Sequence, residues 1–274
     1  MNNKNRIAVT LAQLKANGRK ALVSYIVVGD PNPEVSLPAM HALVKSGADI
    51  LELGIPFSDP MAEGPVIQKG HERALEHNTS LRDTLKIVEQ FRESNSETPI
   101  VLMGYVNPIE RMGYAEFANA AGAAGVDGVI TVDLPPEEVE SFDQELKQHG
   151  IENIFLLAPT TSEERIKRIT AIAGGFLYYV SLKGVTGAGH LDVDSVDKKV
   201  TEIRRYSDLP VLVGFGIKNS DTAKAVGALA DGVVIGSVLV SEMGSKPSAS
   251  SEEICERLND IVSPIRSGLD SLTK

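Results

Sequence analysis

The stretch GADILELGIPF, residues 47–57, decides how the chain folds. It ends a helical pattern with Gly-Ala-Asp and continues as an apolar run that contains one carboxylate, Glu52. The same junction recurs at residues 125–127 (Gly-Val-Asp) and 229–231 (Leu-Ala-Asp), each time between a helical pattern and an apolar run. A junction that is reused along a chain indicates repeated strand–helix units.

Short apolar runs rich in β-branched residues recur along the whole chain, and most are separated by segments with helical spacing and one charged face. They cover residues 21–29, 49–57, 100–107, 128–134, 153–159, 176–181, 210–217 and 232–240. Apolar strands that alternate with helices are typical of parallel sheets covered by helices. We predict an α/β fold, a closed (β/α)8 TIM barrel, as a single domain over residues 1–274, because closure leaves no sheet edge. The alternative is an open doubly wound sheet, but no GxGxxG follows the first run.

An additional helix is predicted ahead of the first strand, over residues 5–18. Its apolar residues Ile7, Leu11 and Leu14 share one side. A helix with one apolar side has to bury it. We expect this helix to plug the amino-terminal face of the barrel.

The composition excludes several classes of function. The chain has 274 residues, of which 42% are hydrophobic and 23% charged, as in folded globular proteins. With 27 basic and 37 acidic residues its net charge is −10, which disfavours nonspecific binding to nucleic acid or to an anionic membrane. No apolar run reaches the roughly 18 residues of a membrane helix, and MNNKNRIAVT lacks a signal-peptide core. A cytoplasmic protein is expected.

Cysteine and histidine give no indication of a metal site. Cys255 is the only cysteine, which excludes intramolecular disulfides and thiolate clusters. The 5 histidines show no HExxH or other metal-ligand spacing, and neither a P-loop nor a GxSxG elbow occurs. The sequence therefore predicts chemistry without a bound metal.

Glu52 is the first candidate for chemistry, because aliphatic residues flank it in a strand predicted to be buried on both faces. Burial disfavours the ionised form of a carboxyl group and raises its pKa. Two interpretations stay open from position alone: a structural carboxyl group satisfied by hydrogen bonds, or a general acid or base. The next loop, residues 56–65, places Asp59 and Glu63 between prolines, which favours an active-site lid over an ordinary solvated loop.

Small residues follow three consecutive strand ends in the second half of the chain. They are the glycines of residues 184–189, the pair Gly214 and Gly216, and Gly236 with Ser237. In barrels, the loops after the seventh and eighth strands commonly bind phosphate through backbone N–H groups. The pattern favours a phosphorylated ligand, although any one of these glycines could instead serve a tight turn.

Four strings make the chain resemble a known family: LELGIPFSDPMAEGPVIQ at residues 51–68, YYVSLKGVTG at 178–187, VGFGI at 213–217 and IGS at 235–237. In these strings, and along its full length, the chain is similar to the α subunit of tryptophan synthase. The resemblance implies a (β/α)8 barrel with an extra N-terminal helix. It also implies retro-aldol cleavage of indole-3-glycerol phosphate to indole and D-glyceraldehyde 3-phosphate, without a cofactor of its own.

The resemblance also implies roles for particular residues. Glu52 is expected to protonate the indole ring at C3 and then to accept the side-chain hydroxyl proton. Glu63 stands where the family usually has Asp and is expected to hydrogen-bond the indole N–H, and Tyr178 matches the family's active-site tyrosine. The remaining matches are phosphate-binding Gly187, Phe215, Gly216, Gly236 and Ser237, the indole-pocket residues Tyr25, Met103 and Ile130, and the loop-closing Thr186.

A partner is implied as well. Family members work as α2β2 heterotetramers in which indole passes to the β subunit for L-tryptophan synthesis, and pyridoxal phosphate belongs to that partner. We expect the contact around Asp59, residues 105–108 and residues 133–136. Two other functions stay open: a sugar-phosphate isomerase on the same kind of barrel, or a subunit that activates its β partner while cleaving little, which the departure at Glu63 keeps possible.

Overall fold

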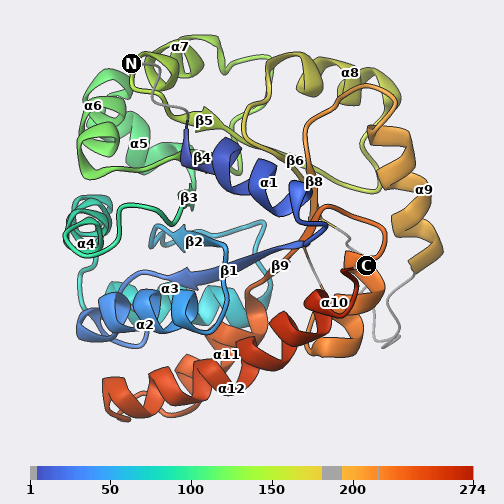
Figure 1. Cartoon of the computed structure of the whole chain (residues 1–274). Helices are drawn as coiled ribbons and strands as arrows, with labels where there is room; N and C mark the ends of the chain where they lie inside the picture. The colour runs from blue at the N-terminus through green and yellow to red at the C-terminus, as the bar shows by residue number, and fades with distance from the viewer. Residues whose placement is uncertain (1–4, 181–192, 215, 274) are drawn as a thin grey trace.

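In the computed structural model, parallel strands occupy the centre of the molecule and helices surround them (Figure 1). The structure describes residues 5–180, 193–214 and 216–273. Within these residues the strands are β1 (Ala21–Val27), β2 (Ile50–Gly54), β3 (Ile100–Gly104), β4 (Gly128–Thr131), β5 (Glu152–Asn153), β6 (Phe155–Leu157), β7 (Leu177–Val180), β8 (Val211–Gly214) and β9 (Gly232–Ile235). Neighbouring strands pair in parallel in the order β5-β4-β3-β2-β1-β9-β8-β7-β6.

The two ends of this order, β5 and β6, are consecutive pieces of one strand. β5 pairs with β4, β6 pairs with β7, and only Ile154 separates them. The Ile154 N–H continues the pairing with β4 by donating to the Val129 carbonyl at 2.9 Å. The 9 segments therefore make eight strands that close into a barrel without a free edge. The predicted (β/α)8 barrel is confirmed, and the open-sheet alternative is wrong.

Helices cover the outside of the ring of strands, and the first of them lies across one end of the ring (Figure 1). They are α1 (Arg6–Ala16), α2 (Pro33–Lys45), α3 (Pro65–Glu76), α4 (Leu81–Arg92), α5 (Val106–Met112), α6 (Tyr114–Ala124), α7 (Glu140–Gln148), α8 (Glu163–Ile172), α9 (Val193–Ile203), α10 (Ser220–Gly227), α11 (Ser237–Ser245) and α12 (Ser251–Asp270). The largest hydrophobic cluster lies between these helices and the outward faces of the strands. Among the described residues, none of the helices is long and apolar enough to cross a membrane.

Alternate residues of each strand point into the barrel, because side chains alternate between the two faces of a strand. On β2, Leu51 and Leu53 belong to the cluster beneath the helices, whereas Ile50 belongs to the cluster inside the barrel. Glu52 follows Ile50 at the next inward position and pairs in register with Tyr25 of β1. The strand alternation thus aims the one carboxylate of this strand at the barrel interior.

The first helix closes the amino-terminal end of the barrel, as the sequence predicts. α1 buries Ile7, Leu11 and Leu14 in one apolar cluster with inward-facing strand residues such as Val23 and Leu212. Figure 1 shows α1 lying across the ring of strands. The side chains inside the barrel therefore pack against a helix at one end.

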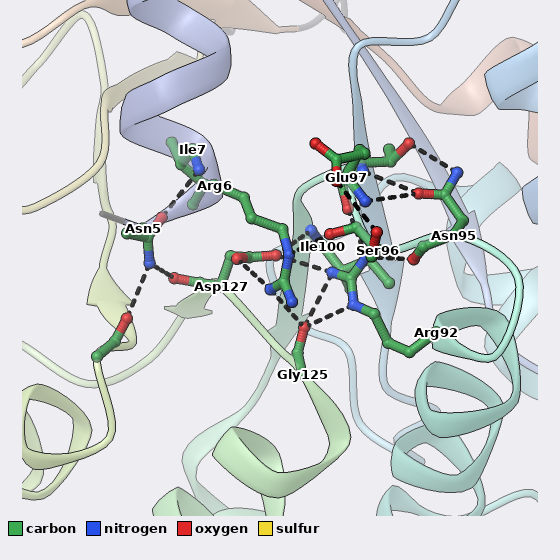
Figure 2. A network of polar contacts seen from close by, with 12 residues as sticks. Asn5, Arg6, Ile7, Arg92, Asn95, Ser96, Glu97, Ile100, Gly125 and Asp127 are labelled. Atoms are coloured by element: carbon green, nitrogen blue, oxygen red, sulfur yellow. Dashed lines mark hydrogen bonds and ion pairs between the residues drawn. The ribbon is translucent and has the colours of Figure 1, made fainter. Parts of the chain in front are cut away.

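A network of polar contacts holds α1 in place (Figure 2). Arg6 of α1 forms an ion pair with Asp127, with Nη1 and Oδ1 2.8 Å apart. Asp127 also pairs with Arg92 at 2.9 Å, and Arg92 donates to the Gly125 carbonyl through Nε and Nη2. The side chain of Asn5, ahead of the helix, donates to the Asp127 carbonyl at 2.8 Å.

Asp127 belongs to the junction that the sequence repeats, and all three aspartates of this repeat make the same contact. Each carboxylate accepts a backbone N–H near the start of the strand beside its own. The pairs are Asp49 with Leu22 (2.8 Å), Asp127 with Ile100 (2.8 Å) and Asp231 with Val211 (2.9 Å). Each carboxylate also pairs with an arginine, namely Arg266, Arg92 and Arg204. The sequence repeat is thus a repeated structural contact that joins neighbouring strands.

Candidate active site

Glu52 is fully buried inside the barrel. Neither of its carboxyl oxygens has a hydrogen-bond partner among the described residues. Burial, and after it the charge of Glu63, raise the pKa of Glu52 to about 8. At pH 7 the group is therefore mostly a neutral carboxylic acid. The structural interpretation of this residue requires satisfying hydrogen bonds, so the geometry favours the general acid.

Glu63 lies near the end of the lid, which we define as residues 57–64 between β2 and α3. Its side chain is half-buried, whereas Asp59 is exposed and Met61 is 79% exposed. Burial raises the pKa of Glu63 to about 7. The charge of Glu63 also raises the pKa values of Glu52 and Tyr178, although burial is the larger cause for both. The Glu63 carboxylate thus influences the protonation of groups inside the barrel, Glu52 among them.

Hydrogen bonds and a ring contact fix the backbone of the lid. The Ala62 N–H donates to the Tyr105 hydroxyl at 3.1 Å. The Phe57 ring stacks on the Tyr105 ring with 5.0 Å between their centroids. The Gln68 side-chain amide donates to the Glu63 carbonyl at 2.9 Å. These contacts tie the lid to α3 and to the start of α5, on either side of its carboxylate.

Two buried tyrosines flank Glu52 inside the barrel, and glycines on the next strands make room for them. A Cβ added to Gly54 would lie 2.3 Å from the Tyr25 hydroxyl oxygen, and one added to Gly214 would lie 2.4 Å from the Tyr178 hydroxyl oxygen. Burial is the main cause that raises the pKa of both tyrosines well above the ordinary value, so both hydroxyls keep their protons. A residue with a Cβ at position 54 would therefore displace the Tyr25 side chain.

The two other indole-pocket candidates line the same space. Ile130 is fully buried in the cluster inside the barrel. Met103 is half-buried and packs against this cluster and against the smaller cluster that contains Tyr25. Together they give the space around Glu52 apolar walls.

The candidate phosphate residues lie only partly within the described chain. Gly187, Phe215 and the loop-closing Thr186 lie outside it. Gly216 has a φ of +78°, a left-handed conformation that favours glycine. Gly236 is the N-cap of α11 and provides no side-chain cap, and Ser237 is the first residue of that helix. The first turn of a helix presents unpaired backbone N–H groups, which suit an anion.

Two residues at the site were missed by sequence reasoning as chemical candidates. Tyr105 was noted only as part of a partner contact, and His71 only as one of the histidines without metal-ligand spacing. His71 is 2% exposed and accepts a hydrogen bond from the Phe57 N–H at 3.2 Å. Nothing in the sequence around position 71, seven residues after Gly64, predicted this contact. Among the described residues, no three His, Cys, Asp or Glu side chains are grouped so that they could hold a metal ion.

The fold and the site define a (β/α)8 barrel that holds two carboxyl groups suited to acid–base chemistry, Glu52 and Glu63. A family model described as "Tryptophan synthase alpha chain" matches residues 11–267. The tryptophan synthase alpha chain of Thioalkalivibrio sulfidiphilus is 56% identical over 260 residues, which cover 94% of this chain and 98% of that protein. That of Thiobacillus denitrificans is 52% identical over 270 residues and covers 98% of both chains. The crystal structure of the α subunit from Legionella pneumophila superposes with a TM-score of 0.90 at 46% identity, covering 97% of this chain and 99% of that one.

The chain belongs to the tryptophan synthase α chain family. It is a carbon–carbon lyase that cleaves indole-3-glycerol phosphate to indole and D-glyceraldehyde 3-phosphate, and the indole goes on to L-tryptophan at the β subunit. The resemblance found in the sequence strings is confirmed. Membership of this family also favours the lyase over the two alternatives, the isomerase and the non-cleaving subunit.

Proposed function

We propose that Glu52 performs both proton transfers of the cleavage. Its proton first goes to C3 of the indole ring, and the resulting carboxylate then accepts the proton of the side-chain hydroxyl. As that proton leaves, the bond between C3 and the glycerol carbon breaks, its electron pair returns to the ring, and the glycerol carbon becomes the aldehyde. The observation that carries this proposal is a fully buried carboxyl group without hydrogen-bond partners among the described residues.

Glu63 is the electrostatic partner in this proposal. Protonation at C3 places positive charge on the ring nitrogen, and a carboxylate there offsets that charge while it accepts the N–H. The pKa of Glu63 is about 7 and that of Glu52 about 8, so the lid carboxyl loses its proton first. Two nearby carboxyl groups with different pKa values suit one acid and one base.

The remaining site residues bind and orient the substrate. The indole ring would lie between Tyr25, Met103 and Ile130, with the Tyr178 hydroxyl beside the reacting carbon. Gly236 and Ser237 would bind the phosphate through backbone N–H groups at the start of α11, together with Gly187, Phe215 and Gly216. Thr186 would close its loop against Glu63.

The partner surface in this proposal is the barrel mouth around the lid. The segments expected to contact the β subunit are joined by hydrogen bonds: the N–H of Ala62, three residues after Asp59, donates to the Tyr105 hydroxyl, and the Val106 N–H donates to the Asp133 carboxylate at 2.8 Å. A continuous surface of this kind supports assembly with the β subunit as an α2β2 heterotetramer. We further propose that the whole chain acts as one barrel domain in the cytoplasm, that it needs no cofactor or metal, and that pyridoxal phosphate is held by the partner alone.

The substitution Glu52→Gln tests the assigned role. The amide keeps the size of the side chain but cannot shuttle the proton, so we expect cleavage to fall by about a thousandfold or more. Binding of a glycerol-phosphate analogue should stay within a few fold of the wild-type value. Stopped assays for indole and calorimetry with the analogue measure the two effects.

A matched control is Glu152→Gln, which makes the same change at a half-buried glutamate of the same sheet, on β5. It should leave turnover unchanged. Normal cleavage by the Glu52→Gln variant would contradict the proposal, as would loss of analogue binding together with cleavage.

A further inference from the structure

The helix that follows the lid, α3, packs against α11, the helix that begins at the proposed phosphate site (Figure 1). Glycines permit the close approach of the two helices. An added Cβ at Gly70 of α3 would lie 2.8 Å from a Val240 methyl group of α11. An added Cβ at Gly244 of α11 would lie 2.4 Å from the Nη2 atom of Arg73, on α3. A larger side chain at either position would therefore require a shift in this interface.

Arg73 lies in this interface and joins three parts of the molecule. Its Nε and Nη2 donate to the two carboxyl oxygens of Asp30 at 2.6 and 2.9 Å. Nη2 also donates to the Val240 carbonyl of α11 at 3.4 Å. The Asp30 side chain is 0% exposed and that of Arg73 is 20% exposed. One guanidinium thus connects α3, α11 and the loop that follows β1.

The guanidinium supplies a defined geometry in addition to its charge. A buried carboxylate needs a counter-ion, so Asp30 requires a cation beside it. A lysine ammonium could supply that charge as a single point. The planar guanidinium instead binds both carboxyl oxygens at once while it keeps an N–H on the Val240 carbonyl. Arg73 is therefore a rigid link between α3 and α11.

The same interface continues into the indole pocket. A small apolar cluster joins the two helices to the barrel, and it consists of Tyr25, Val27, Ala74 and Val240 with Val66, Ile67 and Met103 packed against them. Tyr25 and Met103 are the indole-pocket candidates, and Val66 is the second residue of α3, directly after the lid. An added Cβ at Gly236 would lie 3.1 Å from the Tyr25 ring. The lid helix, the pocket and the start of α11 are thus in continuous contact.

The two ends of the substrate are expected at the two helices. Glu63, proposed to meet the indole N–H, lies just before α3, and its carbonyl accepts from the Gln68 amide of that helix at 2.9 Å. The phosphate is expected at Gly236 and Ser237, where α11 begins. We propose that Arg73 is a positioning residue that fixes the spacing between these two ends, so that one substrate molecule contacts both. The inference rests on the function proposed above, from which it takes the two contacts.

A fixed spacing has a measurable signature in binding. A ligand that occupies only one end does not depend on the distance between the ends. A ligand that spans both ends binds more tightly because its second contact becomes intramolecular, and this gain is lost when the geometry forbids simultaneous contact. A role in stability alone would not distinguish spanning ligands from single-end ligands.

Arg73→Lys tests the proposal, because it keeps a cation beside Asp30 but removes the two-pronged geometry. The spanning probe is indolepropyl phosphate, an uncleavable analogue with both the ring and the phosphate, and the single-end probes are indole and glycerol 3-phosphate. Calorimetry should show the Kd of the spanning probe raised about tenfold and those of the single-end probes within about twofold of wild type. We also expect kcat/KM for indole-3-glycerol phosphate to fall at least about tenfold, since misplaced contacts are costly in rate.

Gly70→Ala tests the same spacing without changing a charge or any residue that contacts the substrate. The added methyl group separates α3 from α11, so the same selective loss of the spanning probe is expected. The matched control is Gly122→Ala, which also replaces a glycine inside a helix, α6, where the added Cβ would lie 3.0 Å from the His149 Cβ. It should leave all three Kd values unchanged. Urea denaturation verifies that each variant is folded under the assay conditions.

The outcomes separate this proposal from the function on which it rests. The role of Arg73 is overturned if Arg73→Lys or Gly70→Ala binds the spanning probe as tightly as wild type does. Weakening of the single-end probes by the same factor would also overturn it. If the wild-type protein binds the spanning probe no more tightly than the better single-end probe, the proposed two-ended binding itself is wrong. Normal cleavage by Glu52→Gln would overturn the proposed chemistry, whatever the Arg73 and Gly70 variants do.

Discussion

The lid carboxylate of this chain, Glu63, is one methylene longer than the aspartate that the family resemblance leads us to expect at this position. The lid backbone is tied at Ala62 and at the Glu63 carbonyl, so the length of the side chain sets how far the carboxylate extends. Shortening it in Glu63→Asp would withdraw the oxygens by about 1 Å, and misplacements of that size cost up to roughly a hundredfold in rate. We expect turnover of the Asp variant to fall at least tenfold, measured as indole release.

The control for this prediction lengthens a carboxylate in the same lid. Asp59→Glu changes an exposed side chain by one methylene and should leave the turnover of the isolated chain unchanged. Equal or faster turnover of Glu63→Asp would mean that the lid backbone adjusts to the family geometry despite its hydrogen bonds.

Among individual residues, the sequence identified those whose environment is formed by their neighbours in the chain. Glu52 could be predicted because its aliphatic neighbours on both sides belong to its own strand. Glu63 and Tyr178 followed from specific strings. The contacts of His71 could not be predicted, because they join it to Tyr25, 46 positions away on another element, and to the backbone N–H of Phe57 in the lid.

Among the elements, α1 is attached to the barrel partly through a buried carboxylate, that of Asp127. Asp127 is 3% exposed at its side chain and neutralises both Arg6 and Arg92. Asp127→Asn can still accept from the Ile100 N–H but leaves Arg92, which is 11% exposed, without its counter-ion. Breaking a buried pair in this way costs about 3 kcal/mol of unfolding free energy, measured by urea denaturation.

The repeated junction offers a matched control for this prediction. Asp231→Asn makes the same change at a junction whose arginine, Arg204, is 43% exposed, so the loss should be about 1 kcal/mol or less. Turnover at low temperature should be unchanged in both variants, because these junctions lie at the starts of the strands. Equal losses at the two junctions would contradict the dependence on burial.

The limits of the elements could be predicted less well than their existence. The apolar run at residues 232–240 reads as one strand, but β9 ends at Ile235 and α11 begins at Ser237. Leu239 and Val240 are buried in that helix, and a short apolar run does not distinguish a buried helix from a strand. The break between β5 and β6 likewise left no trace in the pattern.

For the molecule as a whole, the buried acid of the active site should lower stability as the pH rises. Glu52 has an ordinary pKa of 4.5 when unfolded and about 8 when folded. Its contribution to stability is fully present below pH 4.5, because both states are then protonated. Between the two pKa values only the unfolded state loses the proton, so the unfolding free energy falls by at most about 1.4 kcal/mol per pH unit.

Urea denaturation of the ligand-free protein at pH 5, 6.5 and 8 measures this effect. Glu52→Gln carries no proton to lose, so its stability relative to wild type should increase steadily over this range. Glu63 has a pKa of about 7 in the folded protein, so it also lowers the unfolding free energy as the pH rises to that value. This effect is the same in both proteins. Parallel curves for the two proteins would show that Glu52 is solvated in the folded state.

The closed architecture was predictable because it follows from the order of units rather than from their details. Apolar strands that alternate with helices over the whole chain leave few ways to cover every strand, and a ring covers them all. The distribution of protons between Glu52 and Glu63 was not predictable, since it depends on how much water reaches each carboxyl group.

The helix that seals the amino-terminal end of the barrel has a consequence for traffic through the enzyme. With Ile7, Leu11 and Leu14 filling that end, indole released beside Glu52 has no outlet there among the described residues. Substrate arrival and product departure then use the opposite end of the barrel, where the lid lies. A partner bound over that end would be placed to receive the released indole directly.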